Sequence, residues 1–494
     1  MRKYLLEFIV FICGGVVMIL ELDGSRIMAP FFGNSLIIWT SLIGIILGSL
    51  SLGYYLGGKL ADQISNYKIL SLIIFLSALA IFSIAPLKTG LLDYSARLND
   101  IRIGSLISAL ILFSPASILL GMVSPYAAKI KIKNLNNSGT TVGSLYAIST
   151  VGSIVGTFLA GFFLIPSFGN TKIIIILSLV LLFTSIIASF KFNSLLKIII
   201  FLLITPFLFI DQFSKLPNIK LVADKDTSYN RLLVYDSIDQ VSKRPVRNLM
   251  TDPYGIQSSM FLDKDDGLVF RYARFYYLAE HFNPGFKNSL LVGGGAYSFA
   301  KEYLRKYPDA FLDVVEIDPG YTEIAKQYFN LQDNPRMNIY EQDGRTFINK
   351  TTNIYDVIYL DAFNSALSIP SYLTTAETVK RLADMLNEHG VILANIISAI
   401  DGDKGKFLRA EFHTYKKYFS FVYVFPTYKK DRGDIPQNLV LVAVKTNAEP
   451  LLENANPQLN DFLNARWENK ITVDMPVLTD DYCPVDQYML AILK

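Results

Sequence analysis

The N-terminal part of the chain, up to about residue 211, is so apolar that it is predicted to fold in a lipid bilayer. Crossing the ~30 Å hydrocarbon core takes about 20 mostly apolar residues, and stretches of that length recur here between short polar breaks. We expect about seven spans, at 5–22, 36–57, 69–87, 103–125, 141–166, 172–190 and 195–211. Residues 1–212 are therefore predicted to form a transmembrane helical domain.

Glycines in this part recur at the close spacing that lets membrane helices approach one another. The two groups are Gly44, Gly48, Gly53 and Gly57, and Gly143, Gly152, Gly156 and Gly161. They predict a packed bundle, with helix kinks as the alternative explanation.

Three ionisable residues, Glu21, Asp23 and Arg26, stand at the end of the first span. Such groups usually face a bundle interior or a path for solutes; the alternative is an interfacial position, with Arg26 paired to an acid.

With seven spans and a cytoplasmic C-terminus, 7 Lys and Arg side chains fall on the cytoplasmic side and 9 on the other. This count leans weakly against that orientation. We nevertheless expect a multi-pass cell-membrane protein whose soluble part is cytoplasmic, because that part is predicted below to use nucleotide-like substrates.

The remaining composition argues against two kinds of partner. The net charge is only +3 and charges of both signs are spread through the second half, so no nucleic-acid footprint is present. Three histidines, His281, His389 and His413, lack the spacing of metal ligands, and no metal site is expected.

The second half reads as short strands followed by alternating strands and helices. Strands expected at 231–238, 246–252 and 257–263 form a small β-strand domain over 213–265. From residue 266 to 494 strands and helices alternate, which predicts a parallel sheet with right-handed crossovers. A closing antiparallel hairpin, FSFVYVFP and NLVLVAV, is typical of a class I methyltransferase-like (Rossmann-like) α/β domain.

Glycines and an acid follow the first two strands of this alternating part. Gly293, Gly294 and Gly295 have no Cβ and allow the backbone to approach a ligand at the strand ends, where such sheets bind ligands. Glu316 ends the second strand, 21 residues after Gly295, and an acid there can accept both hydroxyls of a ribose. The alternative for Glu316 is a solvated acid at a strand end.

Aspartates end the next two strands. Asp343, in QDGRTF, can accept the exocyclic amine of an adenine while Gly344 permits a tight turn; helix capping is the alternative. Asp361 ends the apolar strand YDVIYLDAF. Partial burial there would raise its pKa and let it take a proton from an ammonium nucleophile, with an ordinary strand-end aspartate as the alternative.

These motifs together resemble the polyamine aminopropyltransferases, spermidine synthase and its relatives, and more closely the membrane-fused spermidine synthase-like proteins of prokaryotes. In the soluble part the resemblance rests on GIQSSMFLD, LVFRYARFYYLA, LLVGGGAYS, VVEIDPG, QDGRTF, YDVIYLDAF and LTDDYCPVD. In the membrane part it rests on ELDGSRIMAPFFGNS and LGSLSLGYYLGGKLAD.

The resemblance implies polyamine biosynthesis with decarboxylated S-adenosylmethionine as co-substrate. That ligand would lie between the glycine loop, Glu316 and Asp343, with Gln257 over it. A small-molecule amine would attack the carbon next to the sulfonium, with Asp361 as its base or anchor and Tyr229 assisting. The resemblance also implies a possible homodimer.

The chain departs from the family at three positions. Ala296 stands where spermidine synthases have an aspartate after the glycines, Asn364 where they have a second acid, and Asn230 where a glutamine is usual. One carboxylate–ammonium contact contributes ~1 to 3 kcal/mol, so the loss of two predicts weak putrescine binding.

Replacement contacts are available in two stretches. Aromatic residues can hold a cation through their rings, although packing between the small sheet and the large domain explains them as well. Acids near the C-terminus can replace the lost carboxylates, or can belong to a loop that caps the domain edge. The aromatic residues are Tyr272, Phe275, Tyr276 and Tyr277, and the acids are Asp480, Asp481 and Asp486.

We therefore expect a membrane-bound aminopropyltransferase-like transferase that acts on an amine. One alternative is an S-adenosylmethionine-dependent methyltransferase, since the fold does not separate the two. The other is a polyamine transporter or sensor with a degenerate enzyme domain.

Overall fold

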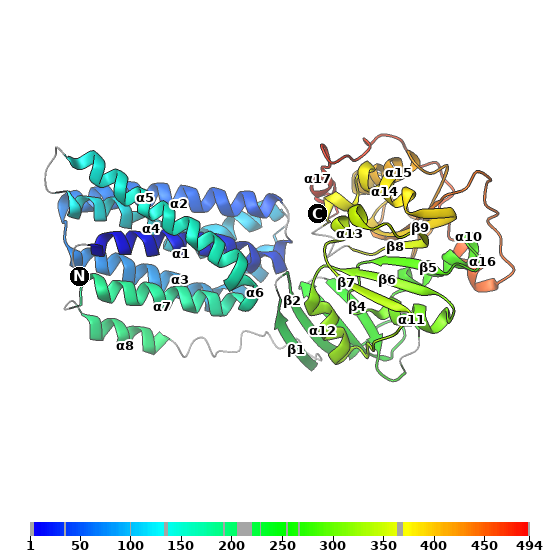
Figure 1. Cartoon of the computed structure of the whole chain (residues 1–494), viewed down its shortest axis with the longest axis horizontal. Coiled ribbons are helices and arrows are strands. Elements are labelled where there is room, and N and C mark those ends of the chain that lie inside the picture. The colour runs from blue at the N-terminus through cyan, green and yellow to red at the C-terminus, as the bar shows by residue number, and fades with distance from the viewer. Residues whose placement is uncertain are drawn as a thin grey trace. The chain divides into compact units, whose positions relative to one another are not determined.

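The computed structural model describes residues 4–33, 36–98, 100–132, 137–190, 193–204, 220–227, 229–252, 255–264, 267–362 and 369–492. The chain divides into two compact units, which Figure 1 shows by the colour change along the chain. The first unit is Met1–Leu216 with Asp226–Ser228, and the second is Pro217–Lys225 with Tyr229–Lys494.

The first unit is a bundle of long apolar helices. Six helical segments of the described chain are long and apolar enough to cross a membrane. They are α1 (Leu5–Phe32), α2 (Leu36–Gln63), α3 (Tyr67–Ala96), α4 (Ile101–Lys131), the continuous run of α5 (Ser138–Leu159), the π-helix η3 (Ala160–Leu164) and α6 (Ile165–Ser167), and α7 (Asn170–Ala188).

The seventh predicted span, 195–211, is represented by α8 (Ser194–Ile204), whose 11 residues are too few to cross the hydrocarbon core. The remainder of that range lies outside the described residues. The other helices are longer than predicted: α1 continues past Asp23 and Arg26 to Phe32. Backbone groups in lipid must bond within the helix, so polar side chains alone do not end it. Arg26 donates to the Ile165 carbonyl at 3.0 Å.

Four of the eight predicted glycines lie at close helix contacts. A Cβ on Gly152 or Gly156 would lie within 2.5 Å of a backbone oxygen of α1. A Cβ on Gly53 or Gly57 would lie 2.2 or 2.6 Å from the nearest atom of α4. A Cβ on any of the other four, Gly44, Gly48, Gly143 and Gly161, would meet no atom within 4 Å in the described part of the chain. Packing therefore explains half of the pattern.

The second unit begins with a small four-stranded sheet in the order β1-β2-β3-β4. Its strands are β1 (Lys220–Asp226), β2 (Arg231–Ile238), β3 (Pro245–Asp252) and β4 (Gly255–Phe261). The last three were predicted, and β1 was not. Buried Leu232, Val234 and Met260 of this sheet form one apolar cluster with Ala296 and Tyr321 of the larger domain.

A seven-stranded sheet in the order β10-β11-β9-β8-β5-β6-β7 forms the centre of the larger domain. The strands are β5 (Asn288–Val292), β6 (Phe311–Glu316), β7 (Met337–Glu341), β8 (Tyr355–Leu360), β9 (Leu386–Ser398), β10 (Phe421–Pro426) and β11 (Gln437–Val444). Strands β5 to β9 are parallel, and β10 and β11 form the predicted antiparallel hairpin. The predicted Rossmann-like fold is thus confirmed.

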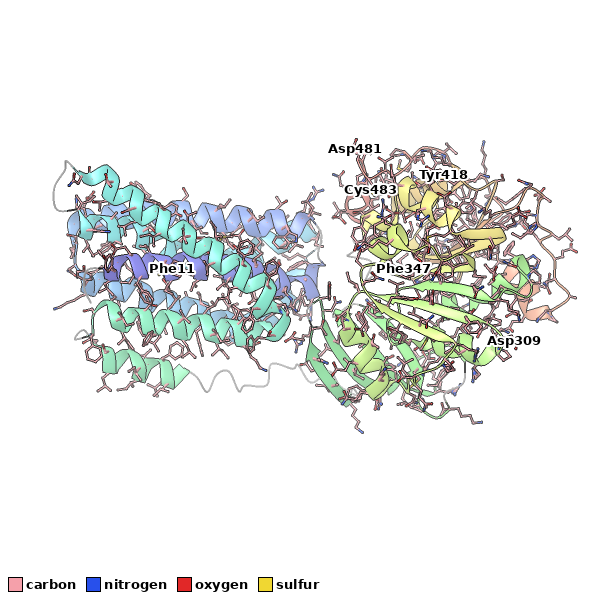
Figure 2. All side chains as sticks on the ribbon, viewed as in Figure 1. Phe11, Asp309, Phe347, Tyr418, Asp481 and Cys483 are labelled. Atoms are coloured by element: carbon pink, nitrogen blue, oxygen red, sulfur yellow. The ribbon has the colours of Figure 1, made fainter. Side chains whose placement is uncertain are left out.

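Helices cover both faces of this sheet (Figure 1). The main ones are α11 (Ser298–Lys306), α12 (Pro319–Tyr328), α13 (Gly344–Lys350), α14 (Ala376–Asp384) and α15 (Lys406–Lys416). Side chains alternate between two clusters: Leu291 joins one, and Leu290 and Val292 join the other. Phe347 of α13 packs against Tyr340 of β7, with ring centroids 4.9 Å apart (Figure 2).

Strand order reverses between β5 and β8, which are direct neighbours in the sheet. Crossovers from β5 lead through α11 to β6 in one direction, while β8 leads through α14 to β9 in the other. Such a switch point leaves a crevice outside the carboxyl ends of the strands, where ligands bind. The residues after β5 and β8 are therefore the first candidates for a site.

Candidate active site

The glycine loop lies at this switch point. Gly293 and Gly295 have φ values of +99° and +50°, which a residue with a side chain rarely adopts. A Cβ on Gly293 would lie 2.3 Å from the Asp361 carbonyl oxygen, so the loop touches the end of β8. Glycine is needed here both for the backbone conformation and for this contact.

Glu316 closes the loop from the end of β6. Its Oε2 accepts hydrogen bonds from the N–H groups of Gly294 and Gly295 at 2.9 and 3.0 Å, and its Oε1 accepts from Asp318 at 3.1 Å. Burial raises the pKa of the Glu316 carboxyl, and the three backbone bonds oppose this shift. Three of about four acceptor positions are thus used by the backbone, and the ribose contact stays a prediction.

The small sheet covers the other side of the loop. The Ala296 N–H donates to Ser258 Oγ on β4 at 3.0 Å, and the Ala296 side chain is fully buried in the cluster between the sheet and α12. Gln257 precedes Ser258 on this covering strand and is half-buried. Position 296 therefore faces packed side chains.

Tyr297, which follows Ala296, takes the left-handed conformation with φ 58° at the start of α11. Its buried hydroxyl pairs with Thr322 Oγ1 at 2.8 Å. For a bulky residue this backbone conformation is strained, and it indicates that the loop is held in place by its surroundings.

Asp343 caps helix α13, where its Oδ1 accepts from the Thr346 N–H at 2.8 Å. A Cβ on Gly344 would lie 2.8 Å from Val292 Cγ1, so α13 starts in close contact with β5. The half-exposed Tyr372 lies near Asp343: burial, and then the Asp343 charge, raise the pKa of the Tyr372 phenol to about 12. Capping is thus observed, and the adenine contact stays a prediction.

Two side chains from distant segments hold Asp361. The Tyr272 hydroxyl donates to Oδ2 at 3.1 Å and Asn395 Nδ2 donates to Oδ1 at 3.0 Å. Asn438 donates in turn to Asn395 Oδ1 at 3.0 Å, which fixes the orientation of that amide. Burial raises the pKa of Asp361 to about 6, although these donors lower it. Such a carboxylate is mostly ionised at pH 7 and is more basic than an ordinary aspartate.

The aromatic stretch 271–282 forms α9 (Arg271–Arg274), the 3₁₀-helix η5 (Phe275–Leu278) and α10 (Ala279–Phe282). Its residues have different roles. Phe275 packs on Phe462 at 4.6 Å between centroids, and the Tyr277 hydroxyl donates to Glu302 at 2.9 Å. These two contacts are structural, but they lie within the large domain and not at its predicted junction with the small sheet.

Tyr272 and Tyr276 instead lie at Asp361. Burial, and then the Asp361 charge, raise the pKa of both phenols. The Tyr276 hydroxyl is fully buried and lies beside Asp361, whose pKa it lowers. The sequence did not reveal a Tyr272 hydrogen bond to Asp361, because 89 residues separate the two. An aromatic run just before the glycine-loop strand is the signal that pointed to this region.

Tyr229 is 52% exposed and acts on the pKa of Tyr372, which lies near Asp343. Assistance to Asp361 by Tyr229 stays a prediction. Asn364, the predicted replacement for a second acid, lies outside the described residues.

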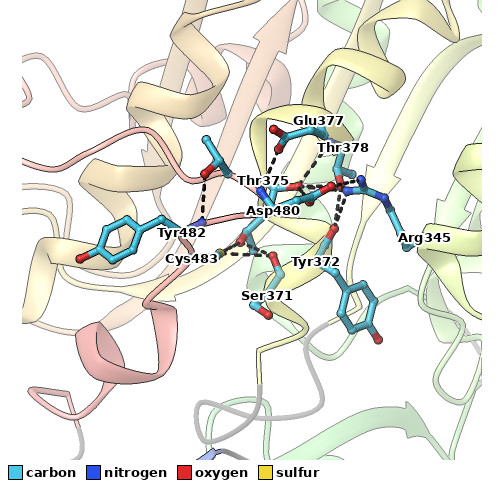
Figure 3. A network of polar contacts seen from close by, with 11 residues as sticks. Arg345, Ser371, Tyr372, Thr375, Glu377, Thr378, Asp480, Tyr482 and Cys483 are labelled. Carbon is cyan, nitrogen blue, oxygen red and sulfur yellow. Dashed lines mark hydrogen bonds and ion pairs between the residues drawn. The ribbon is translucent and has the colours of Figure 1, made fainter.

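The C-terminal segment contacts the residues around Tyr372 and Thr375 (Figure 3). Arg345 donates to the Tyr372 carbonyl at 2.9 Å and pairs with Asp480 at 2.7 Å. Thr375 also donates to Asp480, at 2.7 Å. Asp480 is therefore engaged in structure, which argues against its role as a replacement anchor. Asp481 is exposed (Figure 2), and Asp486 lies on α17 (Val485–Met489).

Comparison with known proteins identifies this domain. The family described as "Spermine/spermidine synthase domain" matches residues 275–431, which include the glycine loop, Glu316, Asp343 and Asp361. A polyamine aminopropyltransferase of Vibrio vulnificus is 27% identical over 248 residues, covering 47% of this chain and 80% of that protein. Residues 275–431 thus match the spermine/spermidine synthase domain, and the chain is similar to polyamine aminopropyltransferases. It is accordingly a transferase.

Relatives of the spermidine synthase-like domain differ in how much of the chain they share. Polyamine aminopropyltransferase 2 of Aquifex aeolicus is 21% identical over 408 residues, covering 78% of this chain and 78% of that protein. That match is longer than the second unit and so extends into the membrane unit. A solved structure of a probable spermidine synthase from Corynebacterium glutamicum is 21% identical, with TM-score 0.40, covering 49% of this chain and 84% of that one.

Proposed function

We propose that the second unit transfers an aminopropyl group from decarboxylated S-adenosylmethionine to a primary amine, a reaction of polyamine biosynthesis. The observation that carries this proposal is Asp361, a buried carboxylate at the switch point whose pKa is raised to about 6. The polyamine aminopropyltransferase relatives support the same reaction class.

The donor half of the site suits an adenosine-bearing cation. Positive-φ glycines leave backbone exposed to a ligand, and carboxylates stand at the ends of β6 and β7. In this proposal Glu316 holds the ribose, Asp343 the adenine amine and Gln257 covers the ligand. The ligand lies against the backbone of four glycines, Gly293, Gly294, Gly295 and Gly344.

The acceptor half is built around Asp361. The amine nitrogen attacks the carbon next to the sulfonium, a N–C bond forms, the C–S bond breaks, and the thioether nucleoside leaves with the electron pair. The sulfonium is already a good leaving group, so the chain mainly positions the amine and removes its proton. Asp361 accepts that proton, and Tyr272 and Asn395 hold the carboxylate in place.

We further propose that the second unit is cytoplasmic. With the six spans of the described residues as the crossings, the N-terminus and the second unit share one side of the membrane. Eleven Lys and Arg residues then fall on that side and five on the other, in agreement with the positive-inside rule. The first set is Arg2, Lys3, Lys59, Lys68, Lys129, Lys131, Lys133, Lys191, Lys197, Lys215 and Lys220; the second is Arg26, Lys88, Arg97, Arg102 and Lys172. Protease digestion of the second unit in inverted but not right-side-out vesicles checks this orientation.

Calorimetric titration and single-turnover assays of the detergent-purified full chain test the reaction. Tighter binding of decarboxylated than of intact S-adenosylmethionine, with release of methylthioadenosine when a mixture of amines is added, is the expected result. Glu316→Ala confirms the site by weakening donor binding. Methyl transfer from the intact form would replace the proposal with a methyltransferase, and binding of neither ligand would remove the enzyme assignment.

A further inference from the structure

The surroundings of Asp361 contain a single negative charge. Among the described residues, Asp361 is the one carboxylate that acts on the phenols of Tyr272 and Tyr276. Its hydrogen-bond partners, Tyr272 and Asn395, are neutral. The segment 363–368, outside the described residues, reads FNSALS and contains no ionisable residue. A substrate here meets one carboxylate, which is enough for one ammonium group.

Aromatic rings line this carboxylate. Phe270 stacks on Tyr272 at 5.8 Å between centroids, and Tyr276 contacts Tyr272 at 6.1 Å and Phe299 at 4.9 Å. The buried Tyr276 hydroxyl lies beside Asp361 and lowers the pKa of that carboxyl, so an amine bonded to Asp361 would also meet this hydroxyl. Rings also suit the methylene groups next to an ammonium.

The sheet brings a basic loop to the same edge. Because β9 is parallel to β8 and β11 is antiparallel to β9, the loop 427–436 between β10 and β11 lies at the edge where β8 ends. Asn438 of β11 reaches Asp361 through Asn395. Tyr428 of this loop acts electrostatically on Tyr272, which bonds Asp361.

Three exposed cations and one exposed tyrosine of this region form what we call the acceptor rim, defined as Arg271, Lys429, Lys430 and Tyr428. The Arg271 guanidinium lies over the Tyr428 ring at 5.8 Å, and Tyr428 acts electrostatically on Tyr272. The three cations of the rim make no ion pair within the described chain.

Acids of the loop do not cancel this charge. Arg432 pairs with Asp434 at 2.8 Å, Asp431 adds a negative charge to the loop, and the Asp401 carboxylate lies next to Gly433 of the loop. The rim has three cations and these two further acids, so a smaller excess of positive charge remains. A second ammonium group on a substrate would therefore be repelled here, whereas an anionic group would be attracted.

We infer that the acceptor is a primary amine with a single ammonium group and an anionic group, carboxylate or phosphate, at its far end. This inference rests on the aminopropyl transfer proposed above. The ammonium binds Asp361 and Tyr276, and the far end meets the acceptor rim. A diamine is selected against, because its second ammonium meets more cations than carboxylates at the rim. Free ω-amino acids and the phosphoethanolamine head of a lipid share this chemistry.

A series of acceptors tests the inference with the detergent-purified full chain and decarboxylated S-adenosylmethionine. The series is 4-aminobutyrate, phosphoethanolamine, butylamine and putrescine, followed by vesicles that contain phosphatidylethanolamine. We expect kcat/KM to fall from the anionic amines through butylamine to putrescine. Turnover of the vesicles above that of free phosphoethanolamine identifies the lipid source, and the reverse identifies a free metabolite. A kcat/KM for putrescine equal to or above that of the anionic amines overturns the inference.

Charge reversal at the rim provides an independent test. Lys429→Glu with Lys430→Glu should raise KM for 4-aminobutyrate by about tenfold and lower KM for putrescine. Lys350→Glu is the matched control, since this exposed lysine ends α13 toward the opposite edge of the sheet and should change neither value. Unchanged KM values in the double variant overturn the role of the rim.

Failure of this inference is distinguishable from failure of the proposed function. Preference for putrescine removes the anionic acceptor and leaves aminopropyl transfer in place. No methylthioadenosine with any amine, while the donor binds, removes aminopropyl transfer itself.

Discussion

Two buried carboxylates flank the switch point of the large sheet, and they are held in opposite ways. Backbone N–H groups of the glycine loop and of Asp318 bond Glu316. Side chains from two distant segments bond Asp361. Burial raises the pKa of both groups. Backbone partners follow from the fold alone, whereas side-chain partners change with single substitutions, so the donor half is fixed by the fold and the acceptor half is adjustable.

Asp361→Asn should produce the largest effect, because it removes the base and leaves the donor half intact. We expect turnover to fall by about 10² to 10⁴-fold with little change in the affinity for the donor. Single-turnover transfer and calorimetric donor titration measure the two quantities. Asp356→Asn, on the same strand but at its far end, is the control and should retain turnover. Equal losses of turnover and donor affinity would show that the donor half and the acceptor half of the site do not act independently.

Gly293→Ala tests the contact between the halves. Its Cβ would lie 2.3 Å from the Asp361 carbonyl oxygen at φ +99°, so it should displace the base and lower turnover by about 10²-fold. Gly285→Ala is the matched control: its φ is +77° but no described atom lies within 4 Å of the added Cβ, so only a backbone cost of about 1 to 2 kcal/mol is expected. Thermal unfolding and turnover are measured for both. Equal turnover losses would assign the effect to backbone strain instead of the contact.

The carboxylates of the site could be predicted from the sequence, whereas the side chains that bond Asp361 could not. Glu316, Asp343 and Asp361 were found because each ends a strand whose apolar pattern is clear, and strand ends of a parallel sheet meet at one edge. Tyr272 and Asn395 were assigned no contact with Asp361, since no local pattern reports a bond between segments 89 or 34 residues apart. The seventh predicted span stays a prediction, because α8 covers Ser194–Ile204 and the rest of that range lies outside the described residues.

Glu316→Ala should weaken donor binding by about 10 to 100-fold, because it leaves three backbone N–H groups without their acceptor and opens the loop. Turnover at saturating donor should fall much less. Asp313→Asn, on the same strand, is the control, since its carboxylate accepts from Tyr355 and Asn338 away from the loop. Donor binding is measured by calorimetry. An unchanged dissociation constant for Glu316→Ala would remove this residue from the donor half.

Tyr272→Phe is the mildest change and separates positioning from packing. The ring remains, but one hydrogen bond to Asp361 is lost, and turnover should fall about threefold to tenfold. That bond lowers the pKa of Asp361, so its loss raises a pKa that already lies at about 6. Because only the deprotonated carboxylate takes a proton, kcat/KM rises with pH through this pKa, and the variant's rise should lie at higher pH than that of the unmodified protein.

Tyr277→Phe, which loses a bond to Glu302 instead, should leave the pH profile unchanged. A Tyr272→Phe profile that matches the unmodified protein would mean that Tyr272 only packs, and that the acceptor half is held by Asn395.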